Sequence, residues 1–258
     1  MERITGISLM QAKADALRQE GKTIGFVPTM GFLHEGHLSL VDEAKKYADI
    51  IVMSIFVNPT QFGPNEDFER YPRNIEQDEA LAESRGVDIV FIPEVNEMYP
   101  SKNLTWVIVE KITDVLCGST REGHFRGVAT VVAKLFNIVK PHVAVFGQKD
   151  AQQASVITKM VENLNMDIDI KVAPIVREAD GLAMSSRNVY LSPEDRKNAV
   201  ILSKSLFAIK DGIDKGEKLS GLLEKARRSI QSVSGARLDY LEARSYPNLE
   251  TVNTCDKV

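Results

Sequence analysis

The sequence predicts an α/β fold of the Rossmann-like, doubly wound type, in which helices cover both faces of a parallel sheet. Three observations support this. Short runs rich in valine, isoleucine and phenylalanine recur along the first 176 residues. Helical patterns lie between these runs, so successive strands need crossover connections. The runs are apolar on both faces, which is typical of strands in a sheet covered on both sides.

The first domain is expected to span residues 1–176 and to contain five strands with helices between them. The predicted strands are residues 23–28, 49–57, 87–93, 142–147 and 168–176. The predicted helices are residues 36–46, 75–85, 128–140 and 152–164. Ligands of such sheets bind beyond the carboxyl ends of the strands, so residues that follow a strand are the first candidates for a site.

From about residue 177 the alternation stops, which indicates a smaller α+β domain over residues 177–258. Ser192 has the character of a helix N-cap, and Pro193 that of a first helical residue. Helices are therefore predicted over residues 193–212 and 220–233. An alternating pattern predicts a strand over residues 237–243.

Composition narrows the class of protein. There are 32 Lys+Arg and 36 Asp+Glu, for a net charge of −4, and 43% of residues are hydrophobic, which excludes collagen-like, disordered and coiled-coil chains. No apolar run approaches the ~20 residues that span a bilayer, and the N-terminus lacks a secretory signal pattern. Mild acidity argues against a nucleic-acid or membrane-surface partner. Cys117 and Cys255 form no disulfide framework or metal motif. We therefore expect a cytoplasmic protein of enzyme size.

The first candidate site is the segment from Pro28 to His37, directly after a predicted strand. His34 and His37 share one face of the helix that follows, and Gly36 lets the backbone approach a ligand closely. A helix N-terminus suits a phosphate, and histidines there can donate hydrogen bonds to it. The alternatives are a pair of surface or capping histidines, or a metal site, for which no third Cys or His lies nearby.

The second and third candidates are a strand end and a loop. Lys149 follows the strand at residues 142–147, and its compact charge suits phosphate. Asp150 either caps the next helix or binds a ribose hydroxyl. Residues 180–188 bring two serines and Arg187 into a turn-rich loop that can clamp a triphosphate, with a plain solvated loop as the alternative.

Two glutamines are candidate site residues with uncharged polar side chains. Gln61 follows the strand at residues 49–57, and Gln153 opens a predicted helix. An amide both donates and accepts hydrogen bonds, which suits a hydroxy acid. Residues 121–128, with two arginines and His124, form either a mobile wall of the site or the approach to a helix.

Taken together, these segments resemble the pantoate–β-alanine ligase (pantothenate synthetase) family. The matching segments occur in the family's order and spacing, at residues 28–37, 56–63, 71–73, 124–128, 146–153 and 176–191. The family belongs to the nucleotidyltransferase group, whose H-x-G-H and K-M-S-K-S-like signatures are shared with class I aminoacyl-tRNA synthetases. The first signature is His34-Glu35-Gly36-His37 here, and Met184-Ser185-Ser186-Arg187 is the counterpart of the second.

The resemblance implies that ATP and Mg²⁺ drive the condensation of pantoate with β-alanine through a pantoyl adenylate, releasing AMP and pyrophosphate. It implies a homodimer and a catalytic set of His34, His37, Lys149 and Arg187. The implied ATP site consists of Met30, Gly31, His34, Gly36, His37, Gly147, Lys149, Asp150, Val176, Met184, Ser185, Ser186 and Arg187. Gln61 and Gln153 would hold pantoate, with Asn58 nearby. The alternative is another carboxylate-adenylating enzyme or nucleotidyltransferase of the same fold.

The chain departs from the family's pattern at four places. Gln148, Ala151 and Thr60 stand where glutamate, tyrosine and methionine are common, and we expect altered packing there without altered chemistry. Family members continue for some tens of residues beyond the point that corresponds to Val258, so we expect a truncated second domain.

Overall fold

The computed structural model of the protein describes residues 1–254, and Cys255 lies outside them. Its centre is one six-stranded sheet in the order β1-β4-β3-β2-β5-β6. The strands are β1 (Glu2–Ile4), β2 (Ile24–Thr29), β3 (Ile50–Ile55), β4 (Ile89–Phe91), β5 (Val143–Gly147) and β6 (Asp169–Ala173). Every neighbouring pair is parallel, which confirms the predicted sheet.

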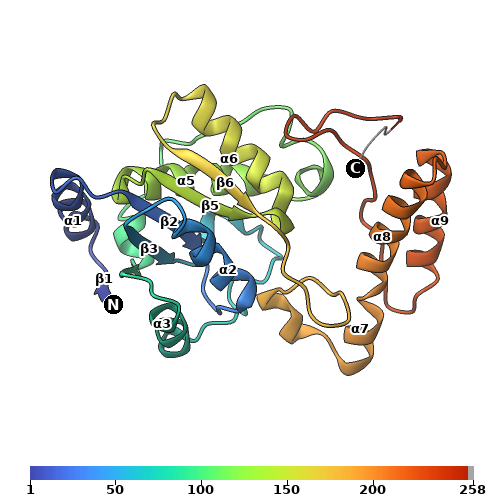
Figure 1. Ribbon diagram of the computed structural model, residues 1–258, viewed down its shortest axis with the longest axis horizontal. Coiled ribbons are helices and arrows are strands. Elements are labelled where there is room, and N and C mark those ends of the chain that lie inside the picture. The colour runs from blue at the N-terminus through green and yellow to red at the C-terminus, as the bar shows by residue number, and fades with distance from the viewer. Residues whose placement is uncertain (255–258) are drawn as a thin grey trace.

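Helices cover both faces of the sheet (Figure 1). They are α1 (Ile7–Gln19), α2 (Glu35–Ala44), α3 (Ile75–Ser84), the short α4 (Val95–Met98), α5 (His124–Val139) and α6 (Ala151–Asn163). Helices α1, α5 and α6 bury their apolar sides in the larger core, and α2 and α3 pack into a smaller one. The doubly wound prediction is therefore confirmed.

The order of the strands predicts where a ligand can bind at the edge of the sheet. From β2 the chain builds outward through β3 to β4, and then returns to the other side of β2 to form β5 and β6. The direction of winding therefore reverses between β2 and β5. In open α/β sheets, ligands bind at such a reversal, beyond the carboxyl ends of the strands.

Two N-terminal elements were not predicted. Strand β1 has only three residues, and it forms because it pairs in register with β4. Helix α1 buries Met10, Ala14 and Leu17, whose spacing of four and three residues is the helical signal that was available in the sequence.

Between the sheet and residue 254 the chain forms three α-helices, α7 (Pro193–Asn198), α8 (Ile201–Asp214) and α9 (Leu219–Gln231), drawn in orange and red in Figure 1. One helix was predicted where α7 and α8 stand. It is interrupted at Ala199 and Val200, where the Leu202 N–H donates to the Ala199 carbonyl in an i→i−3 turn. The predicted strand at residues 237–243 is wrong, because within residues 1–254 no strand pairs with that segment. None of the described helices is long and apolar enough to cross a membrane.

Candidate active site

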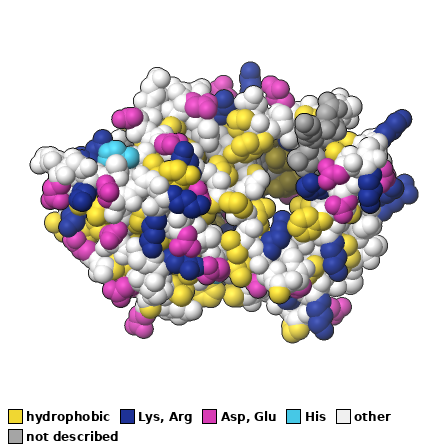
Figure 2. Space-filling view, in the orientation of Figure 1, with side chains coloured by type: hydrophobic (Ala, Val, Ile, Leu, Met, Phe, Trp, Pro, Cys, Tyr) yellow, Lys and Arg dark blue, Asp and Glu magenta, His cyan; other side chains and the backbone are white. Residues whose placement is uncertain are grey.

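A pocket lies beyond the carboxyl ends of β2 and β5, where the winding of the sheet reverses. Figure 2 shows apolar side chains and several basic ones gathered along the boundary between the sheet region and α7–α9. The pocket is lined by all but one of the predicted site residues: Met30, His34, Gly36, His37, Asn58, Gln61, Gly147, Lys149, Asp150, Gln153, Val176, Met184, Ser185, Ser186 and Arg187. Gly31 is the exception.

The two histidines are held by the first turn of α2. His34 is the N-cap of the helix, and its Nδ1 accepts the Gly36 N–H at 3.1 Å. His37 Nδ1 accepts the His34 N–H at 3.3 Å, and the two ring centroids lie 4.1 Å apart. Because both Nδ1 atoms accept backbone N–H groups, each neutral ring carries its proton on Nε2. Capping and ligand binding are therefore compatible, since each Nε2–H is left as a donor.

These histidines are uncharged at neutral pH. Burial lowers the pKa of His37 to about 3, and the neighbouring His34 and Lys149 add to the effect. Burial and the Lys149 charge lower the pKa of His34 to about 4. A neutral imidazole offers a hydrogen bond without a full charge, so the positive charge of the pocket comes from its lysine and arginines.

The turn before α2 depends on an aspartate that the sequence did not single out. Gly31 has φ +82° and Phe32 φ +50°, and a Cβ on Gly31 would lie 2.9 Å from Asp78 Oδ2. Asp78, from α3, accepts the N–H groups of Phe32 at 2.8 Å and Leu33 at 2.6 Å. Its carboxylate thus satisfies two buried donors that have left the strand ladder. The turn therefore requires a glycine at position 31, and Gly31 itself does not line the pocket.

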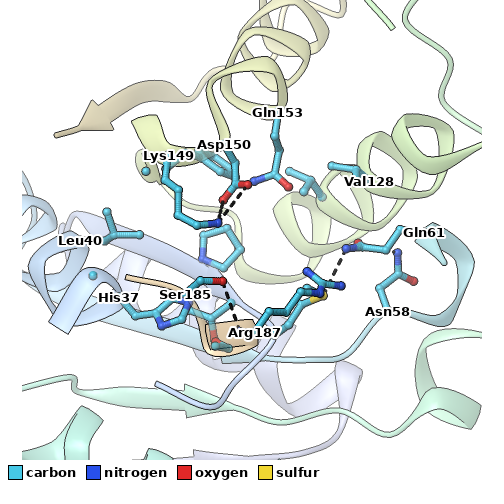
Figure 3. Close-up of a pocket in the computed structure, with 18 of the residues that line it drawn as sticks. His37, Leu40, Asn58, Gln61, Val128, Lys149, Asp150, Gln153, Ser185 and Arg187 are labelled. Atoms are coloured by element: carbon cyan, nitrogen blue, oxygen red, sulfur yellow. Dashed lines mark hydrogen bonds and ion pairs between the residues drawn. The ribbon is translucent and has the colours of Figure 1, made fainter. Parts of the chain in front are cut away.

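Lys149 and Asp150 meet at the end of β5. The Lys149 Nζ lies 3.4 Å from both carboxylate oxygens of Asp150 (Figure 3). Asp150 occupies the N-cap position of α6, but its side chain accepts no capping hydrogen bond. The capping alternative for Asp150 is therefore wrong, and the pair faces the pocket.

A hydrogen-bond network centred on Asn58 holds the side chain of Gln61. It ends the short 3₁₀ helix η1 (Pro59–Gln61), and its Oε1 accepts from Asn58 Nδ2 at 3.2 Å. Asn58 Nδ2 also donates to the Gly127 carbonyl at 3.3 Å, and Asn58 Oδ1 accepts from the Tyr99 hydroxyl at 2.9 Å. Asn58 therefore orients the Gln61 amide. In Figure 3, Gln61 and Gln153 extend into the same space from η1 and α6.

The loop at residues 180–188 borders the pocket beside the histidine segment, and Figure 3 shows Ser185 next to His37. Ser186 Oγ donates to the Phe32 carbonyl at 3.1 Å, and Ser185 Oγ accepts the Arg187 N–H at 3.3 Å. The solvated-loop alternative is therefore wrong for these residues. Arg187, however, already has an anionic partner. Its Nε and Nη2 donate to Asp67 at 2.8 and 2.9 Å, so the carboxylate of Asp67 offsets the positive charge that an incoming anion would meet.

A second arginine–carboxylate pair borders the pocket. Arg121 donates to Glu66 from Nε at 2.7 Å and from Nη2 at 2.6 Å. His124 Nδ1 lies 2.8 Å from the Gln61 carbonyl, and its Nε2 lies 3.0 Å from Arg121 Nη1. Residues 121–128 thus both border the pocket, through Arg121, His124 and Val128, and lead into α5, which begins at His124. The pairing of Arg121 with Glu66 was not predicted, because the sequence does not show that these two residues meet.

Comparison with known proteins identifies the family. The sequence matches the family described as pantoate-beta-alanine ligase over residues 2–258. A protein of Acetivibrio thermocellus named pantothenate synthetase is 59% identical over 254 residues, which are 98% of this chain and 90% of that protein. One of the same name from Geobacter sulfurreducens is 52% identical, over 100% of this chain and 91% of that protein.

Solved structures agree with the sequence comparison. The crystal structure of pantothenate synthetase from Thermus thermophilus matches with a TM-score of 0.94 and 44% identity, over 99% of this chain and 91% of the other. The pantoate-beta-alanine ligase of Francisella tularensis, solved with β,γ-ATP and β-alanine, matches with a TM-score of 0.79 and 37% identity, over 89% and 86% of the two chains. The chain therefore belongs to the pantoate–β-alanine ligase family.

Proposed function

We propose that this protein catalyses the ATP-dependent condensation of pantoate with β-alanine through pantoyl adenylate. Family membership supports the overall reaction. The observation that carries it to this chain is the pocket at the sheet reversal, where two neutral histidines, Lys149 and two glutamines line one space. These groups match what a phosphoryl substrate and a small hydroxy acid require.

In the first step a pantoate carboxylate oxygen attacks the α-phosphorus of ATP. A bond forms between that carboxylate oxygen and the α-phosphorus, the bond from the α-phosphorus to the oxygen shared with the β-phosphorus breaks, and pyrophosphate leaves. We assign the Nε2–H donors of His34 and His37, together with the Lys149 ammonium, to the phosphate oxygens on which charge develops. Donors held in place by backbone hydrogen bonds need no reorganisation as that charge forms. No side chain is needed as a nucleophile.

In the second step the amine of β-alanine attacks the acyl carbon of the adenylate. The carbon–nitrogen bond forms, the acyl carbon–oxygen bond breaks, AMP leaves and the amine nitrogen loses a proton. We assign Gln61 and Gln153 to holding pantoate during both steps, with Asn58 orienting Gln61. Positioning is the main contribution, because two bound reactants held in line gain most of the available acceleration.

The remaining contacts with ATP are assigned to other residues that line the pocket. We propose that Met30, Gly36, Gly147, Asp150, Val176 and Met184 surround the nucleotide. Ser185, Ser186 and Arg187 are proposed to hold its phosphates. Residues 1–254 contain no group of three or more His, Cys, Asp or Glu side chains suited to a metal. Magnesium would therefore be bound mainly by the phosphate oxygens, whose charge it would neutralise. Asp150, beside Lys149, is the protein carboxylate that could contribute a further oxygen ligand.

The organisation of the protein is proposed from the family resemblance. Residues 1–176 would form the domain that binds ATP and pantoate, and residues 177–258 a lid whose loop contributes Ser185 and Arg187. We further propose that the protein works as a homodimer in the cytoplasm. Sedimentation of the purified protein across a concentration series tests the dimer directly.

Exchange of labelled pyrophosphate into ATP tests the reaction. With pantoate, ATP and magnesium and no β-alanine, exchange is expected, because the adenylate forms before the amine takes part. Release of phosphate and ADP without exchange would indicate an acyl phosphate route. A panel of small hydroxy acids tests the alternative, since equal exchange with unrelated acids would point to a different carboxylate-adenylating enzyme.

A further inference from the structure

Arg121 has no role in the reaction steps given above, although it lines the same pocket as Gln61 and Lys149. Its side chain is 28% exposed, so it is neither a core residue nor a freely solvated one. The assigned roles leave one charged group of the substrates without a partner. That group is the carboxylate of β-alanine, which stays ionised and unreacted through both steps.

The guanidinium of Arg121 is held rigidly and still has donors to offer. His124 Nδ1–H donates to the Gln61 carbonyl at 2.8 Å, so its Nε2 must accept, and Arg121 Nη1 is the donor at 3.0 Å. Glu66 takes the Nε–H and one Nη2–H. A guanidinium has five N–H groups, so one on Nη1 and one on Nη2 have no partner among residues 1–254.

The position of Arg121 also suits the amine substrate. Through a single imidazole, His124, it is tied to the backbone of Gln61, the residue proposed to hold pantoate. An anion bound there lies beside the acyl group to be attacked, and two methylene groups join the carboxylate of β-alanine to its amine. The donors left on Nη1 and Nη2 are available for charge-assisted hydrogen bonds to a carboxylate.

We propose that Arg121 binds the carboxylate of β-alanine and so makes the second step specific for an amine that carries an acid group. This inference rests on the proposed function. The competing explanation is that the Arg121–Glu66 pair only ties the loop at residues 63–70 to the start of α5. If the pair were only structural, loss of either partner should have the same effect. If Arg121 binds the substrate, loss of Arg121 should have the larger effect.

The test compares two variants and two amines. Arg121→Gln removes the charge, and Glu66→Gln is the matched control that breaks the same ion pair but leaves the guanidinium. Each protein is assayed for kcat/KM with β-alanine and with n-propylamine, which has a methyl group in place of the carboxylate. Pantoate-dependent pyrophosphate exchange without any amine is measured beside them, and urea unfolding confirms that each variant is folded.

Arg121→Gln is expected to lower kcat/KM for β-alanine about 10- to 100-fold, the usual contribution of hydrogen bonds to a charged group, and to leave n-propylamine nearly unaffected. Glu66→Gln should keep the preference for β-alanine. Equal losses in the two variants, equal losses with the two amines, or an unmodified protein without preference for β-alanine would each overturn the proposal. Failure of the proposed function would show differently, as absence of pantoate-dependent exchange in the unmodified protein.

Discussion

Replacing Gly127 with alanine tests whether the contact between α5 and η1 holds Gln61 in place. A Cβ on Gly127 would lie 2.3 Å from the Thr60 carbonyl oxygen and 2.7 Å from the Gln61 Cα. These are backbone atoms, so they cannot rotate away as a side chain would. Since carbon–oxygen contacts settle at about 3.3–3.6 Å, η1 must move by roughly 1 Å.

That displacement should reduce both stability and activity. Overpacking costs about 1–3 kcal/mol, and the better helix propensity of alanine offsets at most about 1 kcal/mol of it. We therefore expect a net loss of about 1–2 kcal/mol in the free energy of unfolding. A shift of about 1 Å in a positioning residue can cost roughly 100-fold in rate, so kcat/KM for pantoate should fall by that order.

Pyrophosphate exchange measured against pantoate concentration, with urea unfolding beside it, gives both quantities. Gly221→Ala is the matched control, because Gly221 lies in α9 and its Cβ would meet no atom within 4 Å. The control should gain up to about 1 kcal/mol and keep its exchange rate. If Gly127→Ala gained stability like the control and kept its KM for pantoate, the steric reasoning would be refuted.

Three further predictions concern the charges of the pocket. Lys149→Ala should lower the exchange rate about 100-fold or more without unfolding the protein, and near-normal exchange would remove Lys149 from the phosphate site. Asp67→Asn should lower the KM for ATP about 3- to 10-fold, because it removes the negative charge that offsets Arg187, and a higher KM would show that Asp67 instead supports binding. The pKa of His37 falls from 6.5 to about 3 on folding, so its contribution to stability is full above pH 6.5 and is lost as the pH falls toward 3. At pH 5 the loss is about 2 kcal/mol, and unfolding of His37→Gln should depend less steeply on pH, whereas equal slopes would contradict the low pKa.

Local sequence patterns were sufficient to predict most strands of the sheet and the helices between them. Five strands and four helices of the first domain were predicted near their observed positions, because apolar runs and helical periodicity are properties of short segments. Strand β1 was missed because it exists through its pairing with β4, more than 80 residues away. The strand at residues 237–243 was predicted wrongly for the converse reason, since alternation alone does not supply a partner strand.

The composition of the pocket was also predictable from the sequence. Parallel strands bring their carboxyl ends to one edge, so residues after separate strands must meet there. His34, Lys149 and Gln61 follow β2, β5 and β3, and all three line the pocket. The order of strands and polar residues therefore determined which side chains are near one another.

Only the tertiary structure decided how those side chains are partnered. Arg187 pairs with Asp67 across 120 residues, and Arg121 pairs with Glu66 across 55. The close contact of Gly127 with η1 likewise joins remote segments. Hydrogen bonds and steric contacts act over a few ångströms, and no local pattern in a sequence records which distant groups come within that range.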